Sequence, residues 1–484
     1  MNALLVASIF FWFFHAQHRI FYYLFLWQSK SYRIDRFLDE VDRNRGILIP
    51  RISLIALALL VLSGIFKEYF VGYVFVFYLT FGFRSLISFF RRNWRFPKPT
   101  KKIIVLLFFT WAFLAFLFFL FYSSVLKFIL ALEILFPLFV FFSLQLVQIP
   151  TFFAKMYVFW KAAKKREEVN GLQVVGITGS FGKSSTKEFL FTILSEKYRV
   201  LKTEGNVNTE MGVANTMLSK LKSDHQVFIC EMGAYKRGEI KKICQIVKPN
   251  IGILTGINQQ HFSLFKSQEN IIKAKYELIE SLPEDGAAFF NERNKYCLDL
   301  YEKTKVRKIL YGKEAAFLGE ENLLGAIAVA KELGMSEKDI LIGVSKIKNK
   351  LSGIEVKQGI GGLKIIDATY SANPDGVIAH LEYLNDFPGK KVVVMPCLIE
   401  LGKSSKEVHL EIGKKIAEVC DLAIITTNNC FSYIKETGGE KVFLIRDSKG
   451  IFEKIKSSIG NKGTVLLEGR ESMAPNRLLK MLVL

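Results

Sequence analysis

Val174-Val-Gly-Ile-Thr-Gly-Ser-Phe-Gly-Lys-Ser-Ser-Thr-Lys-Glu-Phe-Leu190 is the stretch of this 484-residue chain that decides its fold. An apolar run that ends at Ile177 predicts a buried strand, and the amphipathic segment after Lys183 predicts a helix. The glycine-rich turn between them is typical of a phosphate-binding loop. Gly179 and Gly182 allow backbone N–H groups to converge on an anion at the helix N-terminus.

The residues after the turn suit a nucleoside triphosphate. Lys183 is placed to reach the outer phosphates, and the Ser184 hydroxyl is placed to touch Mg²⁺. The spacing differs from a strict Walker A motif, because Ile177 stands where the first glycine belongs. The alternative is an ordinary strand-to-helix turn with a surface lysine, but strand, loop, Lys-Ser pair and helix together favour nucleotide binding.

The composition points to a membrane and a reducing compartment. Half of the residues are hydrophobic, the 44 phenylalanines crowd into the first third, and the formal net charge is +21. Many basic residues flank apolar stretches, which favours a cytoplasmic membrane face over nucleic-acid binding. No cysteine spacing indicates a zinc site or a disulfide framework, which fits the cytoplasm. The six cysteines are Cys230, Cys244, Cys297, Cys397, Cys420 and Cys430.

Residues 1–150 predict about five transmembrane helices, since several apolar stretches approach the roughly 20 residues that a span needs. These stretches lie near residues 2–26, 47–66, 69–90, 103–125 and 128–149. The positive-inside rule then places the N-terminus outside and the domains that follow the last span in the cytoplasm. Four spans with a re-entrant first segment is the alternative. The basic residues between the third and fourth stretches are Arg91, Arg92, Arg95, Lys98, Lys101 and Lys102.

Two charged residues interrupt the apolar stretches. Arg84 lies near a cytoplasmic end, where its long side chain is expected to extend to the membrane surface. Glu133 lies closer to the outer end and either reaches the surface or lines a polar cavity.

The second part of the chain predicts two α/β domains. After a basic linker at 151–170, short apolar runs alternate with helical stretches. Residues 227–231, 251–255 and 287–291 are expected as parallel strands with functional residues at their C-terminal ends. A second series begins near residue 351, with strands near 363–367, 391–395, 422–426, 441–445 and 464–468. The predicted fold is therefore an α-helical transmembrane region followed by α/β domains at 171–350 and 351–484, with the active site in the cleft between them.

Several motifs together resemble the Mur ligases, the amide-forming enzymes of peptidoglycan precursor synthesis. Residues 177–188 resemble their ATP loop, and the similarity covers roughly 170–484. The order of the motifs is most similar to the MurF branch, which adds D-alanyl-D-alanine to a UDP-MurNAc-tripeptide. The other matching motifs are Thr203-Glu-Gly-Asn-Val-Asn-Thr-Glu-Met-Gly212, Glu231-Met-Gly, Thr255-Gly-Ile-Asn-Gln-Gln-His261, Ala274-Lys-Tyr-Glu277, Asp367-Ala-Thr-Tyr-Ser-Ala-Asn-Pro374 and Glu400-Leu-Gly with His409 downstream.

This resemblance implies a P-loop central domain, a Rossmann-like C-terminal domain, and ATP and Mg²⁺ as cofactors. In such enzymes ATP converts a carboxylate to an acyl phosphate, which an amine then attacks. Lys183, Glu231, His261 and Lys275 are the implied catalytic residues. The implied Mg²⁺ ligands are Ser184, Glu231, His261 and Lys275, the last as a carbamylated lysine. The implied ATP-binding residues are Thr178, Gly179, Ser180, Gly182, Lys183, Ser184, Ser185, Asn291, Asp367, Tyr370 and Asn373, and the implied substrate-binding residues are Thr203, Asn206, Asn208 and Thr209.

Each assignment has a structural alternative. Glu231 is also plausible as a solvated carboxylate, and His261 as a structural histidine. Lys275 has an exposed lysine as its alternative, because its helix also carries Lys273. Asn291 fits equally well in a turn, and 367–374 can be a simple turn before a proline.

The chain departs from the family pattern in four ways. Membrane helices stand where the soluble UDP-binding domain is usual. The central domain is shortened between Gly312 and Asn322. The remaining departures are single residues: Glu321 for a histidine, Gly325 for an asparagine, Ile354 for an arginine, Ala368 and Ser371 for Asp and Asn, and Glu468 for a lysine.

The predicted protein is thus a multi-pass enzyme of the bacterial cytoplasmic membrane with cytoplasmic catalytic domains. Its expected partners are membrane lipid, a UDP-linked or lipid-linked muropeptide, and an amino acid or dipeptide. No nucleic-acid partner is expected, and the sequence carries no signal of an oligomeric state. Two alternatives are an ATP-dependent ligase for another envelope peptide or poly-amino acid, and a degenerate nucleotide-binding scaffold.

Overall fold

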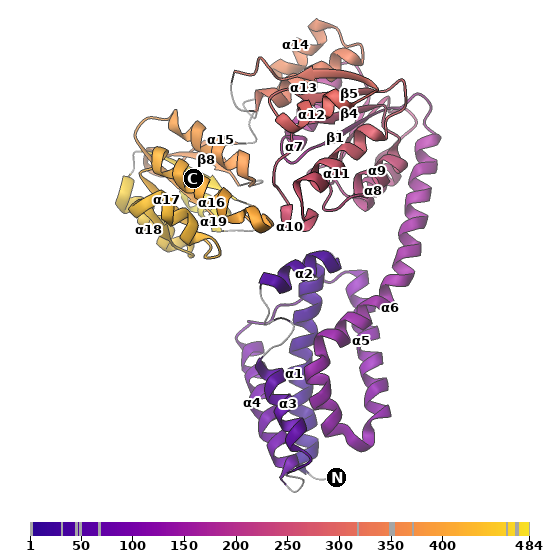
Figure 1. Cartoon of the computed structure of the whole chain (residues 1–484), viewed down its shortest axis with the longest axis vertical. Coiled ribbons are helices and arrows are strands. Elements are labelled where there is room, and N and C mark those ends of the chain that lie inside the picture. Colours follow the sequence, from indigo (N-terminus) through magenta and orange to yellow (C-terminus); the bar gives the residue numbers. More distant parts are fainter. Residues whose placement is uncertain are drawn as a thin grey trace. The chain divides into compact units, whose positions relative to one another are not determined.

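The chain forms two compact units, residues 1–156 and 157–484. The computed structural model describes residues 3–30, 32–43, 47, 51–65, 69–316, 319–347, 354–369, 372–460, 463–469 and 474–483 (Figure 1).

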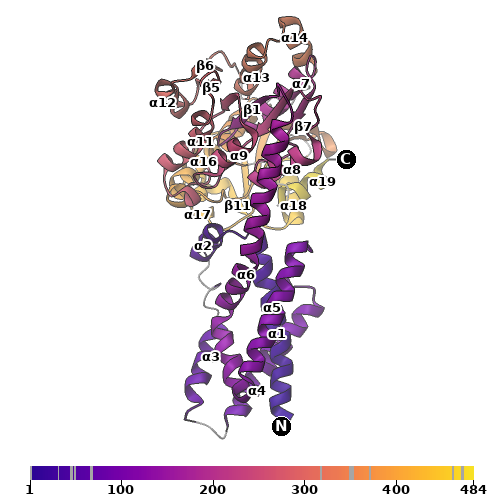
Figure 2. The same ribbon diagram turned by 90° about the vertical axis from the view of Figure 1, so that its right-hand side faces the viewer.

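The first unit is a bundle of apolar helices that run alongside one another (Figure 2). Among the described residues, four helices are long and apolar enough to cross a membrane, namely α1, α4, α5 and α6. The apolar α3 has 12 residues, or about 18 Å at 1.5 Å per residue, against a hydrocarbon core of about 30 Å. The helices are α1 (Ala3–Ser29), α2 (Ile34–Arg43), α3 (Arg51–Leu62), α4 (Phe70–Phe90), α5 (Lys101–Leu120) and α6 (Val125–Glu167). Most of the expected linker at 151–170 is therefore helical.

A buried polar cluster joins the helices of this bundle. Glu133 of α6 is fully buried and forms an ion pair with Arg19 of α1. His15 Nε2 lies 3.2 Å from the same carboxylate, and the Ser53 hydroxyl donates to the Glu133 carbonyl oxygen. Glu133 therefore lies inside a polar cluster instead of reaching the membrane surface, whereas Arg84 is exposed on the bundle.

The second unit begins with a parallel sheet whose strand order is β2-β3-β1-β4-β5-β6. The strands are continuously apolar because helices cover both faces. Helices α7, α13 and α14 pack on one face, and α8, α9, α11 and α12 pack on the other. The strands are β1 (Gln173–Thr178), β2 (Val200–Lys202), β3 (Val227–Glu231), β4 (Ile251–Leu254), β5 (Ala287–Asn291) and β6 (Arg307–Tyr311). The helices are α7 (Lys183–Leu194), α8 (Glu210–Lys220), α9 (Glu239–Val247), α10 (Phe262–Phe265), α11 (Gln268–Glu280), α12 (Lys295–Lys303), α13 (Glu320–Glu332) and α14 (Glu337–Ser345).

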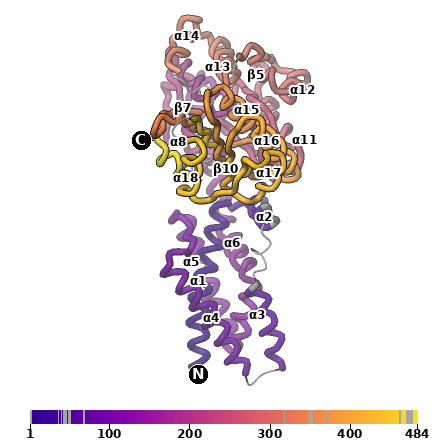
Figure 3. Tube along the Cα trace, turned by 90° about the vertical axis from the view of Figure 1, so that its left-hand side faces the viewer, coloured from indigo at the N-terminus to yellow at the C-terminus, as the bar shows by residue number. Residues whose placement is uncertain are grey.

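A second sheet follows with the order β11-β10-β9-β12-β8-β7, parallel except for the edge strand β7. Helices α15, α16 and α17 cover one face (Figure 3), and α18 and α19 cover the other. The strands are β7 (Glu355–Gln358), β8 (Lys364–Ala368), β9 (Lys390–Met395), β10 (Leu422–Ile425), β11 (Val442–Leu444) and β12 (Gly463–Glu468). The helices are α15 (Pro374–Asn385), α16 (Ser405–Val419), α17 (Phe431–Gly438), α18 (Ser448–Ile459) and α19 (Ala474–Leu482). The predicted fold class, an apolar helical region before two α/β domains, is confirmed.

Candidate active site

The phosphate-binding loop follows β1, at the edge of the first sheet where its parallel strands end. Gly179 and Gly182 have φ values of 155° and 78°, and a Cβ at Gly182 would overlap the side chain of Asn322. Helix α7 begins at Lys183, whose Nζ donates to the carbonyl oxygen of Gly179 at 2.7 Å. Burial lowers the pKa of Lys183. The loop thus holds its lysine folded back over the position where an anion would bind.

Glu231, the last residue of β3, is the centre of a buried polar group beside this loop. Its carboxylate accepts hydrogen bonds from the Ser184 hydroxyl at 2.9 Å and from Asn208 Nδ2 at 3.1 Å. Lys187 Nζ lies 3.0 Å from Glu231 Oε2 and donates to the Gly205 carbonyl oxygen at 2.6 Å. Both charged side chains are almost completely buried, so their pairing offsets much of the desolvation cost.

The expected substrate loop, 203–209, lies against this group. The Thr203 hydroxyl accepts the Glu231 backbone N–H at 3.0 Å, and Asn206 lies in the turn between Thr203 and Asn208. Thr209 caps helix α8 by accepting the Gly212 N–H. Asn208 therefore contacts the proposed catalytic carboxylate, whereas Thr203 and Thr209 hold the backbone around it.

His261 lies close enough to Lys183 and Lys275 to feel their charges, and it connects the two α/β domains. Its backbone is left-handed, with φ of 63°, and its Nδ1 pairs with the carboxylate of Glu400, which follows β9. The Tyr235 ring packs edge-on against the imidazole, with centroids 4.7 Å apart. Burial lowers the pKa of His261, although Glu400 opposes that shift. The imidazole is thereby fixed between the domains.

Lys275, on α11, is buried and only 3% exposed. Burial lowers its pKa from 10.5 to about 7, and the positive charge of Lys183 adds to this shift. A neutral amine is the form that reacts with CO₂, so this environment suits carbamylation. The alternative of an exposed lysine does not hold for Lys275, although it describes its helix neighbour Lys273, which is half exposed.

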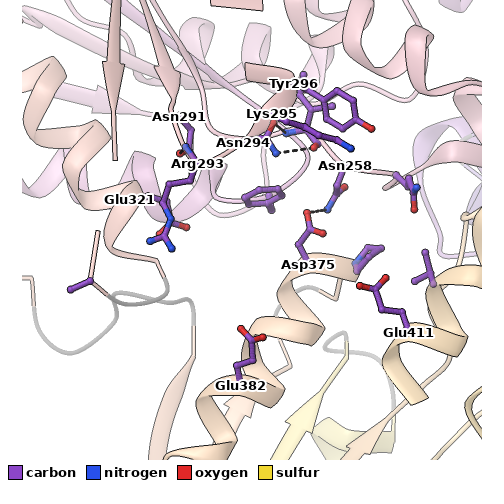
Figure 4. A pocket seen from close by; sticks show the side chains of 16 residues that line it. Asn258, Asn291, Arg293, Asn294, Lys295, Tyr296, Glu321, Asp375, Glu382 and Glu411 are labelled. Atoms are coloured by element: carbon purple, nitrogen blue, oxygen red, sulfur yellow. Dashed lines mark hydrogen bonds between the residues drawn. The ribbon is translucent and has the colours of Figure 1, made fainter. Parts of the chain in front are cut away.

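A cavity of about 680 Å³ lies beside the P-loop and between the two α/β domains, within the usual size range for small-molecule sites. Phe181 and Tyr296 give it aromatic walls, and Asn291 lines it (Figure 4). Asn258 Nδ2 crosses to the C-terminal domain and donates to Asp375 Oδ2 at 2.9 Å and to Asn373 Oδ1 at 3.2 Å. These bonds hold the N-terminus of α15 beside the cavity.

The other expected nucleotide residues fall into three groups. Thr178 and Ser180 hold the loop, because their hydroxyl groups bond to the Met232 carbonyl oxygen and the Asn258 N–H. Ser185 lies in the first turn of α7 and is partly exposed. Asp367 pairs with Lys357 Nζ at 2.6 Å and lines neither this cavity nor the one beside His261. Tyr370 lies outside the described residues.

Sequence reasoning missed three residues that the structure brings to the site. Lys187 follows Lys183 by four positions on one helix, so helical spacing was the available signal. Asn258 precedes His261 by three residues but had no assigned role. Glu400 was noted only as part of a motif, and no local pattern predicts that it contacts His261.

The donor set near the P-loop fits Mg²⁺. Ser184 and Glu231 offer a hydroxyl and a carboxylate, and hard oxygen ligands are what this cation prefers. His261 and Lys275 offer nitrogen, and Lys275 becomes an oxygen donor only if it is carbamylated. The Ser184–Glu231 pair is thus the stronger candidate.

Comparison with known families agrees with this geometry. Residues 177–357 match the Mur ligase middle domain, and residues 354–470 match the Mur ligase glutamate ligase domain. The chain belongs to the Mur ligase family. It is accordingly an ATP-dependent acid–amino acid ligase. The first 176 residues lie outside both matches.

The most similar proteins of this family include MurF enzymes. The UDP-N-acetylmuramoyl-tripeptide–D-alanyl-D-alanine ligase of Bacillus subtilis is 25% identical over 349 residues, which cover 65% of this chain and 76% of that enzyme. The crystal structure of MurF from Acinetobacter baumannii matches with a TM-score of 0.61 and 25% identity, covering 67% of this chain and 80% of that one. MurF from Thermotoga maritima, solved with ADP, has a TM-score of 0.58 and 25% identity, covering 67% and 83%.

Two departures from the family pattern have a structural explanation. Glu468 is fully buried at the end of β12, where its carboxylate pairs with His380 Nδ1 at 2.7 Å. It thus joins β12 to α15 inside the C-terminal domain. Ile354 is 5% exposed and belongs to the core of the same domain. An arginine at 354 would place a charge in this core.

Proposed function

We propose that this Mur ligase is anchored in the bacterial cytoplasmic membrane and joins a muropeptide carboxylate to an amino acid or dipeptide such as D-alanyl-D-alanine. The observation that carries the proposal is the convergence of Lys183, the Ser184–Glu231 pair, Lys275 and the His261–Glu400 pair in one site. The similarity to MurF enzymes, which ligate UDP-N-acetylmuramoyl-tripeptide and D-alanyl-D-alanine, supports this choice of substrates. We place the functional boundaries at 1–150, 151–170, 171–350 and 351–484.

The chemistry requires activation of the carboxylate, because joining it to an amine in water is unfavourable. Phosphoryl transfer from ATP to the carboxylate gives an acyl phosphate that the amine then attacks. The Lys183 ammonium can exchange its hydrogen bond to the Gly179 carbonyl oxygen for one to the transferred phosphoryl group, whose negative charge it would offset. Bound Mg²⁺ would supply further charge neutralisation at these phosphates.

The surrounding residues orient the reactants. Lys187 holds the Glu231 carboxylate toward Ser184. Asn258 of the first α/β domain fixes the start of α15, which belongs to the C-terminal domain, and Glu400 fixes the His261 ring. The Asn258 and Glu400 contacts cross between the two α/β domains, so the amine and the carboxylate meet in a site to which both domains contribute.

The helices of residues 1–156 support the membrane anchor. Within the described part of this unit, four helices are long and apolar enough to span a bilayer, and an acid-free basic segment, 91–102, joins two of them. By the positive-inside rule this segment is cytoplasmic. Because the helical unit stands in place of a UDP-binding domain, we propose a lipid-linked muropeptide as the acceptor.

The first test measures phosphate release from ATP by the purified full-length protein with UDP-MurNAc-tripeptide and D-alanyl-D-alanine. Release that needs both substrates, with a ligated product by mass, is expected. Lys183→Ala should abolish it, whereas Lys273→Ala, a change at a half-exposed lysine, should retain it.

The same assay with a lipid-linked muropeptide in detergent tests the acceptor. Turnover of the UDP-linked substrate alone would refute the lipid-linked proposal. Failure with both acceptors would refute ligation and favour the nucleotide-binding scaffold.

A further inference from the structure

Three residues far apart in the sequence converge in the C-terminal domain, although their spacing indicates no site. Cys397 follows β9, His409 lies on α16, and Cys430 immediately precedes α17. Their sulfur and nitrogen atoms all lie within 4.8 Å of one another. Among the described residues, this is the one group of at least three His, Cys, Asp or Glu side chains with metal-ligand spacing.

The hydrogen bonds give the two thiols different roles. The Cys397 thiol donates to the Thr427 carbonyl oxygen at 3.4 Å, and its sulfur accepts the Cys430 N–H at 3.3 Å. The Cys430 sulfur lies at the N-terminus of α17 and 3.2 Å from the Ser405 hydroxyl. The interaction with Cys397 lowers the pKa of Cys430, with His409 and Ser405 adding to this shift, and the same interaction together with burial raises the pKa of Cys397. Cys430 is thus the nucleophile of the pair.

The environment of His409 argues for thiol chemistry over metal binding. Its Nδ1 donates to the Ser405 carbonyl oxygen at 2.6 Å, and its Nε2 accepts the Leu398 N–H at 3.0 Å. Both ring nitrogens are therefore satisfied by the backbone. A cation that took the Nε2 lone pair would leave a buried N–H without its partner.

We propose that Cys430 and Cys397 form a modification site that undergoes thiol–disulfide exchange with low-molecular-weight disulfides. The Cys430 thiolate attacks one sulfur of the reagent, whose S–S bond breaks and releases one thiolate. Cys397 then loses its proton and attacks the Cys430 sulfur, which releases the second thiolate. The two released thiolates take up the two protons lost by the protein, so the protein dithiol is oxidised and the reagent is reduced.

Little of this site reaches solvent, so a disulfide reagent enters only when the segment around Cys430 opens locally. Cys430 is 9% exposed, and Cys397 lines a cavity of about 20 Å³ that it shares with His261 and Asn373. The two sulfur atoms lie within 4.8 Å of each other, and a disulfide requires them to approach to about 2.05 Å.

Disulfide formation would disturb the active site through the segment 396–401. Cys397 would give up its bonds to Thr427 and to the Cys430 N–H. The same segment carries Glu400, whose carboxylate pairs with His261 and whose carbonyl oxygen accepts the Ser263 N–H at 3.1 Å. Displacing Glu400 by about 1 Å is expected to reduce ligation roughly 10²-fold. This consequence rests on the proposed function, whereas the exchange reaction does not.

The test uses full-length protein in detergent. Its zinc content is measured, and the protein is then reduced, treated with chelator, desalted and exposed to oxidised glutathione. Denaturation, alkylation and peptide mass mapping follow. A disulfide between Cys397 and Cys430 is expected, while the four other cysteines are recovered as alkylated thiols. Recovery of Cys397 and Cys430 as free thiols would overturn the proposal.

The variants separate the two steps. Cys397→Ser should leave Cys430 as a stable mixed disulfide with glutathione, and Cys430→Ser should leave Cys397 unmodified. Cys420→Ser, at a buried cysteine outside the cluster, should behave like the parent protein. A mixed disulfide on Cys397 in the Cys430→Ser variant would contradict the assigned order of attack.

Two further readouts separate this proposal from others. Zinc retained through purification, with exchange only after chelation, would overturn the dithiol role in favour of a metal site. Substrate-dependent phosphate release should fall on oxidation and return with dithiothreitol, in the parent and in Cys420→Ser. Absence of release even from the reduced protein would count against the ligase function and leave the mass mapping to decide the exchange.

Discussion

The buried pair of Lys187 and Glu231 offers the sharpest test of the site. Lys187→Met keeps most of the side-chain volume but removes the ammonium group that bonds to Glu231 Oε2 and to the Gly205 carbonyl oxygen. The Glu231 carboxylate, 1% exposed, then keeps only its neutral partners Ser184 and Asn208. Removing one partner of a buried ion pair costs about 3–5 kcal/mol, because the remaining charge is left uncompensated.

The matching double variant shows whether the pair is the cause. Glu231→Gln alone leaves the Lys187 charge buried and should also destabilise the domain. Lys187→Met combined with Glu231→Gln removes both charges of the pair and should recover most of the loss, which gives a large coupling energy. Lys202→Met is the control, because Lys202 pairs with the half-exposed Glu188, and such pairs contribute about 0–1 kcal/mol.

The assay is amide hydrogen exchange of strand β3, followed by mass spectrometry on the full-length protein. A loss of 3–5 kcal/mol corresponds to exchange that is faster by roughly 10² to 10⁴-fold for amides that open with the domain. Unchanged exchange in Lys187→Met would refute the reasoning. So would additive losses in the double variant, since they would mean that the two charges do not compensate each other.

Three more predictions concern other parts of the molecule. Arg19→Leu should destabilise the helical unit by about 3–5 kcal/mol, because it leaves the buried Glu133 carboxylate without its ion-pair partner, and adding Glu133→Leu should restore the lost stability. Tryptophan fluorescence reports this unfolding, because four of the five tryptophans lie in residues 1–156. With a pKa of about 7, Lys275 is increasingly neutral above pH 7 and protonated below it. Added bicarbonate should therefore stimulate ligation more at pH 8 than at pH 6, and equal stimulation would contradict a carbamylated lysine. Glu400→Gln should lower kcat about 10–100-fold by loosening His261 while the KM for ATP changes little, and an unchanged kcat would remove Glu400 from the positioning role.

Much of the fold was predictable because its signals are local. The strand, glycine turn and Lys183 follow one another within a few residues, and the alternation of apolar runs with helical stretches indicated both α/β domains. Apolar length alone indicated the helical region. Helix α3 is shorter than a membrane span in the described residues, because the hydropathy of a stretch does not fix where a helix begins and ends.

The site was predictable where a motif carries it and unpredictable where the topology does. Strand order places β3 beside β1, and this brings Glu231 to Ser184 from 47 positions away. The resemblance anticipated that meeting, but nothing in the local pattern indicated Lys187 as its third member. The role of Asp367 at the nucleotide stays a prediction from its motif, and the structure adds a partner that the motif did not indicate, Lys357 on the edge strand.

The sequence by itself determined the order of the elements, the phosphate-binding loop and the apolar character of the first unit. Only the tertiary structure decided which polar side chains meet: Glu133 with Arg19 in the helical unit, and Cys397 with Cys430 beside the active site. The physical reason is that periodicity and turn chemistry act over a few residues. Burial, in contrast, forces a polar group to find partners in whichever element the packing places next to it.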